Sequence, residues 1–149
     1  MSTSTVAPNR RAHAVPIQRT LRHHRSEVAR WALANGHPIE RDALAVVVAV
    51  RADPGTGTID QRWDVDEVEQ VMWAAVPMWC AAHHIDSPAD VGTTLGTYLR
   101  YLSAHRRLAA GSDGILALRR AVADHRPGPE RSRARHPASS PAAPVLPIC

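Results

Sequence analysis

Apolar side chains recur along the middle of this chain at the spacing of an α-helix. In residues 17–35 and 88–107 they fall every three or four positions, so that they share one face of a helix. Pro16 precedes the first of these segments and Gly36 follows it, as is usual for proline and glycine at helix boundaries. The sequence therefore predicts an all-α domain, a small bundle of about five helices that spans residues 16–125.

One segment, residues 43–50, is apolar on every side and contains only alanine, leucine and valine. Such a run indicates an element that is buried all round, which is either a helix or a strand. Alanine and leucine favour a helix, whereas the valines favour a strand. We expect a helix, because no partner strand is visible elsewhere in the chain.

The third and fourth expected helices have recognisable starts. Asp64 is suited to cap the third helix, and Glu67 completes the capping-box pattern three residues later. Pro77 lacks a backbone donor, so we expect a kink or a break there. Ser87 and Pro88 have the residue types preferred at an N-cap and at the first helical position, so they should begin the fourth helix. The last helix is expected at residues 113–125.

Two features inside the expected helices indicate packing rather than chemistry. Gly92 and Gly96 lie four residues apart, but no phosphate-loop lysine follows them, so they are expected to admit a closely packed helix. His24 lies in the middle of the apolar face of the first helix. We expect it to be a hydrogen-bonded core residue rather than a ligand or a base.

Charge divides the chain into an acidic centre and basic ends. The net charge is +4, and all 18 of its arginine and lysine side chains are arginine. Residues 1–38 carry six arginines and one glutamate, whereas residues 39–109 carry six arginines and ten acidic side chains. The ends, residues 1–15 and 126–149, are aperiodic and rich in Pro, Ser, Ala and Arg, which predicts disordered basic segments.

The two cysteines, Cys80 and Cys149, do not suggest a disulfide framework, which favours a cytoplasmic location. No apolar run reaches the roughly 18 residues of a membrane span, so no membrane partner is expected. On a continuous helix Cys80 and His84, with His83 between them, would share a face that suits a metal ion. Because no second motif supplies further ligands, we predict neither a metal nor a cofactor.

The polar face of the first helix is a candidate for binding nucleic acid, because arginine forms bidentate pairs with phosphate. Arg19, Arg22 and Arg30 are its candidate contact residues. The alternative is a solvated basic face without a ligand. The turn after this helix faintly resembles that of a helix-turn-helix protein, but residues 43–50 have no side chains able to contact bases. The arginines between residues 10 and 30 are Arg10, Arg11, Arg19, Arg22, Arg25 and Arg30.

Trp63 and Trp73 are the candidate contact residues for a protein partner. Trp73 falls about 80° from the apolar stripe of its helix, so it is either covered by another helix or exposed. Exposed tryptophan is frequent in binding hot spots, although plain core packing is the commoner use of tryptophan. No catalytic arrangement of side chains can be recognised, so we do not expect an enzyme. The favoured function is a protein-interaction or regulatory module that binds an unknown partner or itself, and a nucleic-acid-binding accessory protein is the alternative.

A pattern of apolar and aromatic residues covers about the central two-thirds of the chain. It consists of Trp31-Ala32-Leu33-Ala34, Gly36-His37-Pro38, Arg62-Trp63, Val71-Met72-Trp73, Pro77, Trp79-Cys80, Pro88, Val91, Leu95, Tyr98-Leu99, Leu102, Arg107-Leu108 and Gly111-Ser112. The pattern resembles a group of short helical proteins from actinobacteria that have no assigned activity. The resemblance implies a helical domain in a bacterial cytoplasm and transfers no site residues.

Overall fold

The computed structural model describes residues 10–124, and within this part of the chain the fold is all α, as predicted. The one extended pairing there is an isolated bridge between Ala52 and Ile59. The bundle has five helices when α3, η1 and α4, which follow one another without a gap, are taken as one. The expectations for residues 1–9 and 126–149 lie outside the described part. The elements are α1 (Arg10–Ala34), α2 (Arg41–Arg51), α3 (Val65–Gln70), the π-helical turn η1 (Val71–Ala75), α4 (Val76–Ala82), α5 (Val91–Ala104) and α6 (Ile115–Asp124).

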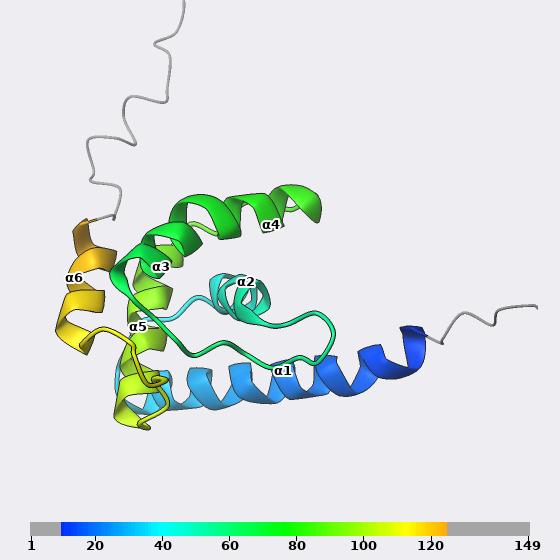
Figure 1. The fold of residues 1–149 in the computed structure, drawn as a ribbon, viewed down its shortest axis with the longest axis horizontal. Helices are drawn as coiled ribbons and strands as arrows, with labels where there is room; N and C mark the ends of the chain where they lie inside the picture. Colours follow the sequence, from blue (N-terminus) through cyan, green and yellow to red (C-terminus); the bar gives the residue numbers. More distant parts are fainter. Residues whose placement is uncertain (1–9, 125–149) are drawn as a thin grey trace, which may run out of the picture.

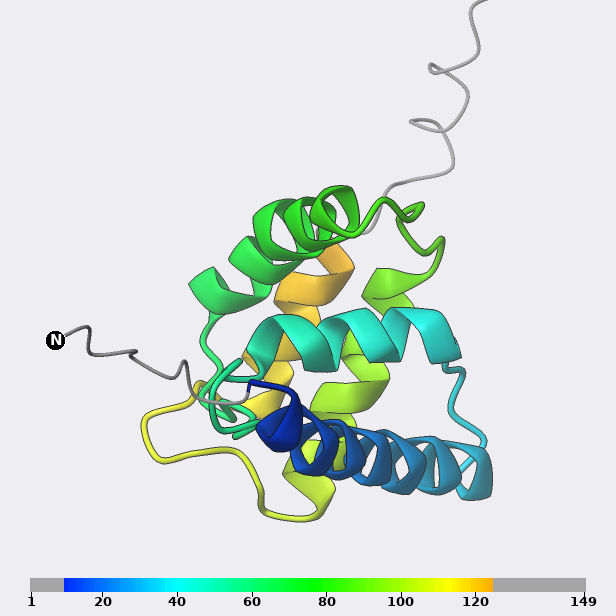
Figure 2. The same cartoon turned by 90° about the vertical axis from the view of Figure 1, so that its right-hand side faces the viewer.

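Helix α2 runs through the centre of the bundle. In Figure 1 it is seen end-on, with α1 on one side, α4 on the opposite side and α5 along a third. Figure 2 shows α2 lengthwise between α1 and the α3–α4 segment, while α6 packs on α5 and α3. A helix surrounded in this way satisfies its own backbone hydrogen bonds, so residues 43–50 form a helix, as expected, and not a strand. Its buried side chains are Ala43, Leu44, Val46, Val47 and Val48.

Helix α1 begins at Arg10, so the prediction that the first helix starts after Pro16 is wrong. Proline has a helical φ and removes a single backbone donor, and α1 continues through it. The predicted end is confirmed, because the His37 N–H donates to the Ala32 carbonyl at 2.8 Å. Gly36 has a φ of +64°, the left-handed conformation that glycine adopts without steric cost. The first turns of α1 thus lie N-terminal to the start that the sequence predicted.

The helix that starts after Asp64 changes its winding before Pro77. Asp64 is the cap, as predicted, and its Oδ1 accepts a hydrogen bond from the Glu67 N–H at 2.8 Å. The next turn is π-helical, and the Val76 N–H donates to the Val71 carbonyl. This wider turn lies directly before Pro77, which has no N–H to continue the backbone ladder. The predicted distortion is therefore present as a π-turn within a continuous helix.

Helix α5 begins at Val91, so the predicted N-cap at Ser87 and the start at the following proline are wrong. The terminus is instead satisfied by a residue that is distant in sequence: a Glu40 carboxylate oxygen accepts a hydrogen bond from the Asp90 N–H at 3.1 Å. The Glu40 N–H in turn donates to the Thr94 hydroxyl at 3.0 Å. These two bonds attach the start of α5 to the segment that precedes α2.

The two glycines of α5 lie where other helices approach it. A Cβ atom at Gly92 would be 3.3 Å from Met72 Cε, and one at Gly96 would be 3.8 Å from Val122 Cγ1. The approach is tight only at Gly92, against the end of the Met72 side chain of η1, whereas a methyl group at Gly96 would make an ordinary contact with α6, so close packing does not require a glycine there.

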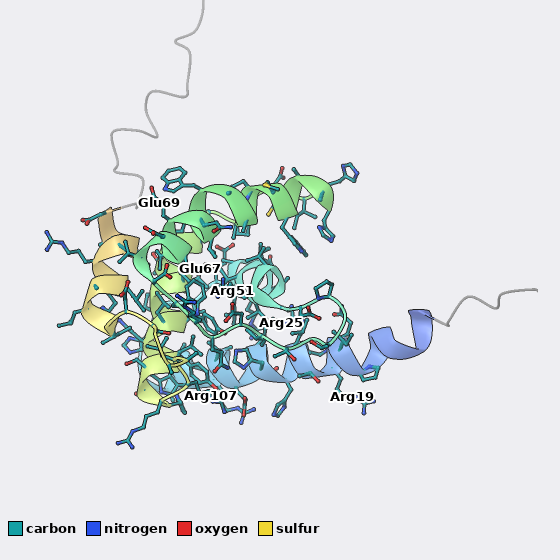
Figure 3. All side chains as sticks on the ribbon, in the orientation of Figure 1. Arg19, Arg25, Arg51, Glu67, Glu69 and Arg107 are labelled. Atoms are coloured by element: carbon teal, nitrogen blue, oxygen red, sulfur yellow. The ribbon has the colours of Figure 1, made fainter. Side chains whose placement is uncertain are left out.

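Arg51, the last residue of α2, attaches the loop after α2 to α3. Its guanidinium pairs with Glu67 and with Asp60, the latter at 3.1 Å, and donates to the Arg62 carbonyl at 2.6 Å. It also lies over the Trp63 ring, 4.6 Å from the ring centroid. Figure 3 places Arg51 beside Glu67, between α2 and α3. We call this set of contacts the α2–α3 junction.

Candidate nucleic-acid interface

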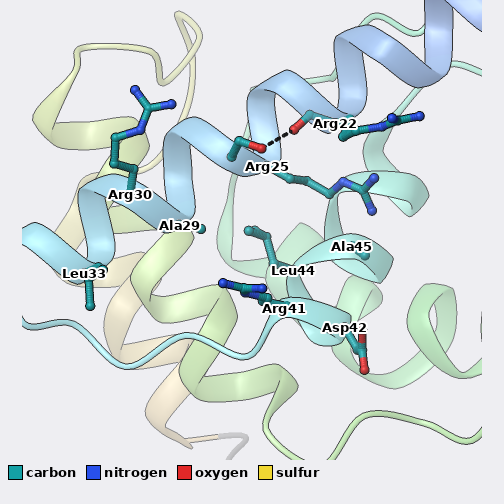
Figure 4. A pocket seen from close by; sticks show the side chains of 10 residues that line it. Arg22, Arg25, Ala29, Arg30, Leu33, Arg41, Asp42, Leu44 and Ala45 are labelled. Atoms are coloured by element: carbon teal, nitrogen blue, oxygen red, sulfur yellow. Dashed lines mark hydrogen bonds between the residues drawn. The ribbon is translucent and has the colours of Figure 1, made fainter.

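A basic groove of about 560 Å³ lies between α1 and α2, and we call it the arginine groove. Four arginines line it, three from α1 and Arg41 from the first turn of α2. Arg25 extends from α1 toward α2, whereas Arg30 points to the outer side of α1 (Figure 4). The groove is thus a channel with cationic walls and an aliphatic floor. Its lining residues are Arg22, Arg25, Ser26, Ala29, Arg30, Leu33, Arg41, Asp42, Leu44 and Ala45.

The helical repeat explains why these side chains meet. Positions 22, 26, 29 and 33 of α1 follow one another at three- and four-residue intervals, so they form a stripe. This stripe borders the face that buries Val28 and Ala32 in the core. Arg41 lies on the first turn of α2, where that helix emerges from the core. The groove forms because α1 crosses α2 at this exposed turn.

The charge of the arginine groove is not neutralised by carboxylates of the described residues. No ion pair within 4.0 Å joins any of its four arginines to an acidic side chain in residues 10–124. Arg25 Nε is buried and has no hydrogen-bond partner in the same range. Asp42 is the one acidic side chain in the lining. A buried donor without a partner is costly, and the positive charge of the groove is left without a paired carboxylate in the described part of the chain.

The predicted nucleic-acid residues have different positions relative to this groove. Arg22 and Arg30 line it, whereas Arg19 lies further toward the N-terminus of α1 and is exposed outside the lining (Figure 3). Arg25, one of the six arginines counted in the sequence but not among the candidates, reaches deepest into the groove. Arg41 was missed, because only the crossing of α1 and α2 brings it to the other side chains.

The helix-turn-helix interpretation is excluded by the position of α2. A recognition helix must present one exposed face to the major groove. Residues Ala43–Val48 of α2 are almost entirely buried between other helices. The arginine groove can therefore contact phosphates, but α2 cannot contact base edges in the manner of that motif.

The two candidate tryptophans have opposite environments. Trp63 is fully buried in the α2–α3 junction, so the prediction that it is an exposed contact residue is wrong. The guanidinium of Arg51 and the surrounding core cover its ring. Trp73, on η1, is 54% exposed, and Met78, on α4, is 70% exposed. Trp73 thus retains a surface that a protein partner can contact.

The cysteine and histidine pair is separated by the end of its helix. Cys80 is buried on α4, but α4 ends at Ala82, and His84 has a φ of +55°. The i and i+4 relation that a shared metal face requires is therefore absent. His83 stacks on Trp79 with ring centroids 3.9 Å apart. Among the side chains that the structure describes, those of residues 16–124, no group of three or more His, Cys, Asp or Glu is arranged to hold a metal ion.

His24 is a hydrogen-bonded core residue, as predicted. It is 7% exposed, and its Nε2 lies 3.0 Å from the Tyr98 hydroxyl. Burial lowers the pKa of His24, and the positive charge of Arg107 lowers it further. Burial also raises the pKa of the Tyr98 hydroxyl, so the pair is neutral and joins α1 to α5.

Among the helices of the described residues, none has an apolar stretch long enough to span a bilayer. The similarity to short actinobacterial proteins stays a prediction from the sequence pattern. No protein-family model, no curated protein and no solved structure matches this chain.

Proposed function

We propose that this chain is a non-enzymatic nucleic-acid-binding module that holds backbone phosphates in the arginine groove. The observation that supports this most directly is that four arginines from two helices line one open groove, and that none of them forms an ion pair with a carboxylate of the described residues. Arginine binds phosphate oxygens in a bidentate manner and stays charged at every relevant pH. A nucleic-acid ligand also fits the cytoplasmic location that the sequence predicts.

The groove suits a phosphate backbone better than a base edge. Its floor is aliphatic, formed by Ala29, Leu44 and Ala45, and the exposed Leu33 lies at its edge. Phosphate contacts position a nucleic acid, whereas specificity needs donors and acceptors that face the bases. We therefore expect the groove alone to bind with a strong dependence on salt and little dependence on sequence.

A binding assay with matched variants tests this function. A fluorescein-labelled eight-nucleotide strand is titrated with the protein at several salt concentrations, and anisotropy gives the affinity. Replacing Arg22 and Arg25 by Ala should lower the slope of log affinity against log salt by about 1.4, the value for two lost phosphate contacts on a single strand. The control removes the same charge from α6 by replacing Arg119 and Arg120 by Ala, and it should change the slope little. Equal effects of the two double variants would show that the groove has no special role.

A second function, the protein-interaction module that the sequence favours, is supported by the apolar surface at Trp73 and Met78. Both are large, exposed, apolar side chains on one continuous helical segment. A partner or a second copy of the chain would bury them on binding. Sedimentation of the protein at increasing concentration tests the self-association form of this proposal. The variant Trp73→Ala should shift the equilibrium toward monomer, and a wild-type chain that stays monomeric throughout contradicts it.

A further inference from the structure

A second hollow, of about 300 Å³, lies on the other side of α1 from the arginine groove, against the end of α5. Arg30 lines both hollows, so a ligand that leaves the arginine groove over the outer side of α1 reaches the second one directly. We call this second hollow the aromatic pocket. Its lining residues are Glu27, Arg30, Trp31, Ala34, Tyr101, His105 and Arg107.

Three rings form the wall of the aromatic pocket. The centroids of Trp31 and Tyr101 are 5.7 Å apart, those of Trp31 and His105 are 6.0 Å apart, and those of Tyr101 and His105 are 4.4 Å apart. Tyr101 is buried, whereas Trp31 is half-buried and His105 is exposed, so solvent still reaches two of the rings. Trp31 meets Tyr101 and His105 edge to face, at interplanar angles of 69° and 74°, so its neighbours hold the ring in place while its accessible part can stack on a flat heterocycle.

The pocket also has an acceptor whose present contacts are long. Glu27 Oε1 lies 3.6 Å from His23 Nε2, and Glu27 Oε2 lies 3.5 Å from an Arg107 nitrogen. Arg107 makes its short hydrogen bond elsewhere, with the Tyr101 hydroxyl at 2.8 Å. Both Glu27 oxygens can therefore accept a hydrogen bond from a ligand. A carboxylate repels a phosphate group, so the aromatic pocket complements the arginine groove rather than extending it.

We propose that the aromatic pocket holds one base of a single-stranded nucleic acid whose phosphates occupy the arginine groove, and that it prefers guanine. This inference rests on the proposed function. Stacking on the exposed rings accepts any base, whereas the carboxylate selects among them. The Watson–Crick edge of guanine presents two adjacent N–H donors to the two carboxylate oxygens, whereas adenine presents a single amino group there. A duplex keeps its bases stacked inside, so it cannot fill the pocket.

The test uses three labelled eight-nucleotide strands that are all thymidine except for one central position, which is guanine, adenine or an abasic site. Wild-type protein should bind the guanine strand about tenfold more tightly than the abasic strand, as expected for one stacked base. The variant His105→Ala should remove most of this difference. The variant Glu27→Gln should remove the preference for guanine over adenine while retaining that over the abasic strand. Both side chains lie at the surface, which avoids the loss of folding expected on replacing Trp31.

The outcomes separate the pocket from the groove. If the three strands bind wild-type protein equally, and replacing Arg22 and Arg25 still weakens binding, the base subsite is wrong and the proposed function stands. If no strand binds at low salt, the proposed function itself is wrong. Guanosine monophosphate serves as a competitor, and an affinity for this free nucleotide equal to that for the guanine strand would show that the ligand is a free nucleotide and not a strand. The control Leu116→Ala, at an exposed apolar side chain of α6 outside both hollows, should leave all three affinities unchanged.

Discussion

The α2–α3 junction and the arginine groove use the same side chain in opposite ways. In the junction Arg51 is 7% exposed, pairs with Asp60 and Glu67, and covers a buried tryptophan. In the groove Arg25 also has a buried nitrogen, but no described side chain pairs with it. Burial lowers the pKa of Arg51, and nearby carboxylates oppose that effect. In the groove, no carboxylate of the described residues forms an ion pair with an arginine.

The difference indicates which arginines stabilise the fold through paired charges and which do not. A buried charge that is paired on all sides is part of the structure, and removing it leaves its partners without compensation. A cluster of like charges without paired counter-charges repels itself and opposes folding, so removing one of its members should not destabilise the fold. Residue type does not separate the two groups, whereas burial and the positions of the carboxylates do.

The largest expected effect is on the junction itself. Trp63 is fully buried, so Trp63→Ala should lower the free energy of unfolding by about 4 kcal/mol through lost burial and the cavity left behind. Trp73→Ala, at the half-exposed tryptophan of η1, should cost about 1 kcal/mol or less. Urea denaturation followed by circular dichroism measures both changes. Similar losses for the two variants would contradict the buried position of Trp63.

The next effect concerns the charge of the junction. Replacing Arg51 by Ala should lower the free energy of unfolding by about 3 kcal/mol, because Glu67 and Asp60 lose their partner and the Trp63 ring loses its cover. Arg51→Lys keeps the charge but cannot make all the bonds of the guanidinium fork, so it should recover part of the loss. Urea midpoints for the three proteins test this order. An alanine variant as stable as the wild type would mean that the pairs contribute nothing.

A smaller effect should appear as a pH dependence at His24. Burial and then Arg107 lower its pKa below 6.5, whereas in the unfolded chain the imidazole titrates near 6.5. Below about pH 6.5 the unfolded state therefore binds a proton that the folded state does not, and the free energy of unfolding falls as pH decreases. Comparing urea midpoints near pH 7.5 and near pH 5.5 should show a larger decrease for the wild type than for His24→Gln, which does not titrate. Equal decreases would assign the pH dependence to other groups.

Local pattern was sufficient to predict much of the fold. The apolar run at residues 43–50 predicted a fully buried element, and the structure makes it the central helix. The capping pattern at Asp64 and the distortion before Pro77 were also predicted correctly. Each of these depends on residues within one or two turns of each other. The start of α5 was missed because its terminus is satisfied by Glu40, which lies 50 residues earlier.

The candidate site was predicted less completely, for the same reason. Helical spacing identified the polar face that contains Arg22 and Arg30, but it could not identify Arg41 as their neighbour. Nor could it place His105 beside Trp31, because that contact depends on where α5 ends relative to α1. Spacing also assigned Trp63 and Trp73 to the same candidate surface, although one of them is buried. Side-chain partners across helices are set by tertiary packing, which periodicity does not encode.

The smallest expected change in stability, and the sharpest contrast with Arg51, is at Arg25. Removing a buried donor that has no partner relieves a cost, and removing one of four neighbouring positive charges relieves repulsion. Against this stands the lost packing of its aliphatic stem. We therefore expect Arg25→Ala to unfold at the same urea concentration as the wild type or at a slightly higher one, within about 1 kcal/mol, while its affinity for a labelled strand falls. A variant that loses several kcal/mol of stability would place Arg25 with Arg51 among the residues that maintain the fold, and the groove would then lose its strongest claim to a ligand.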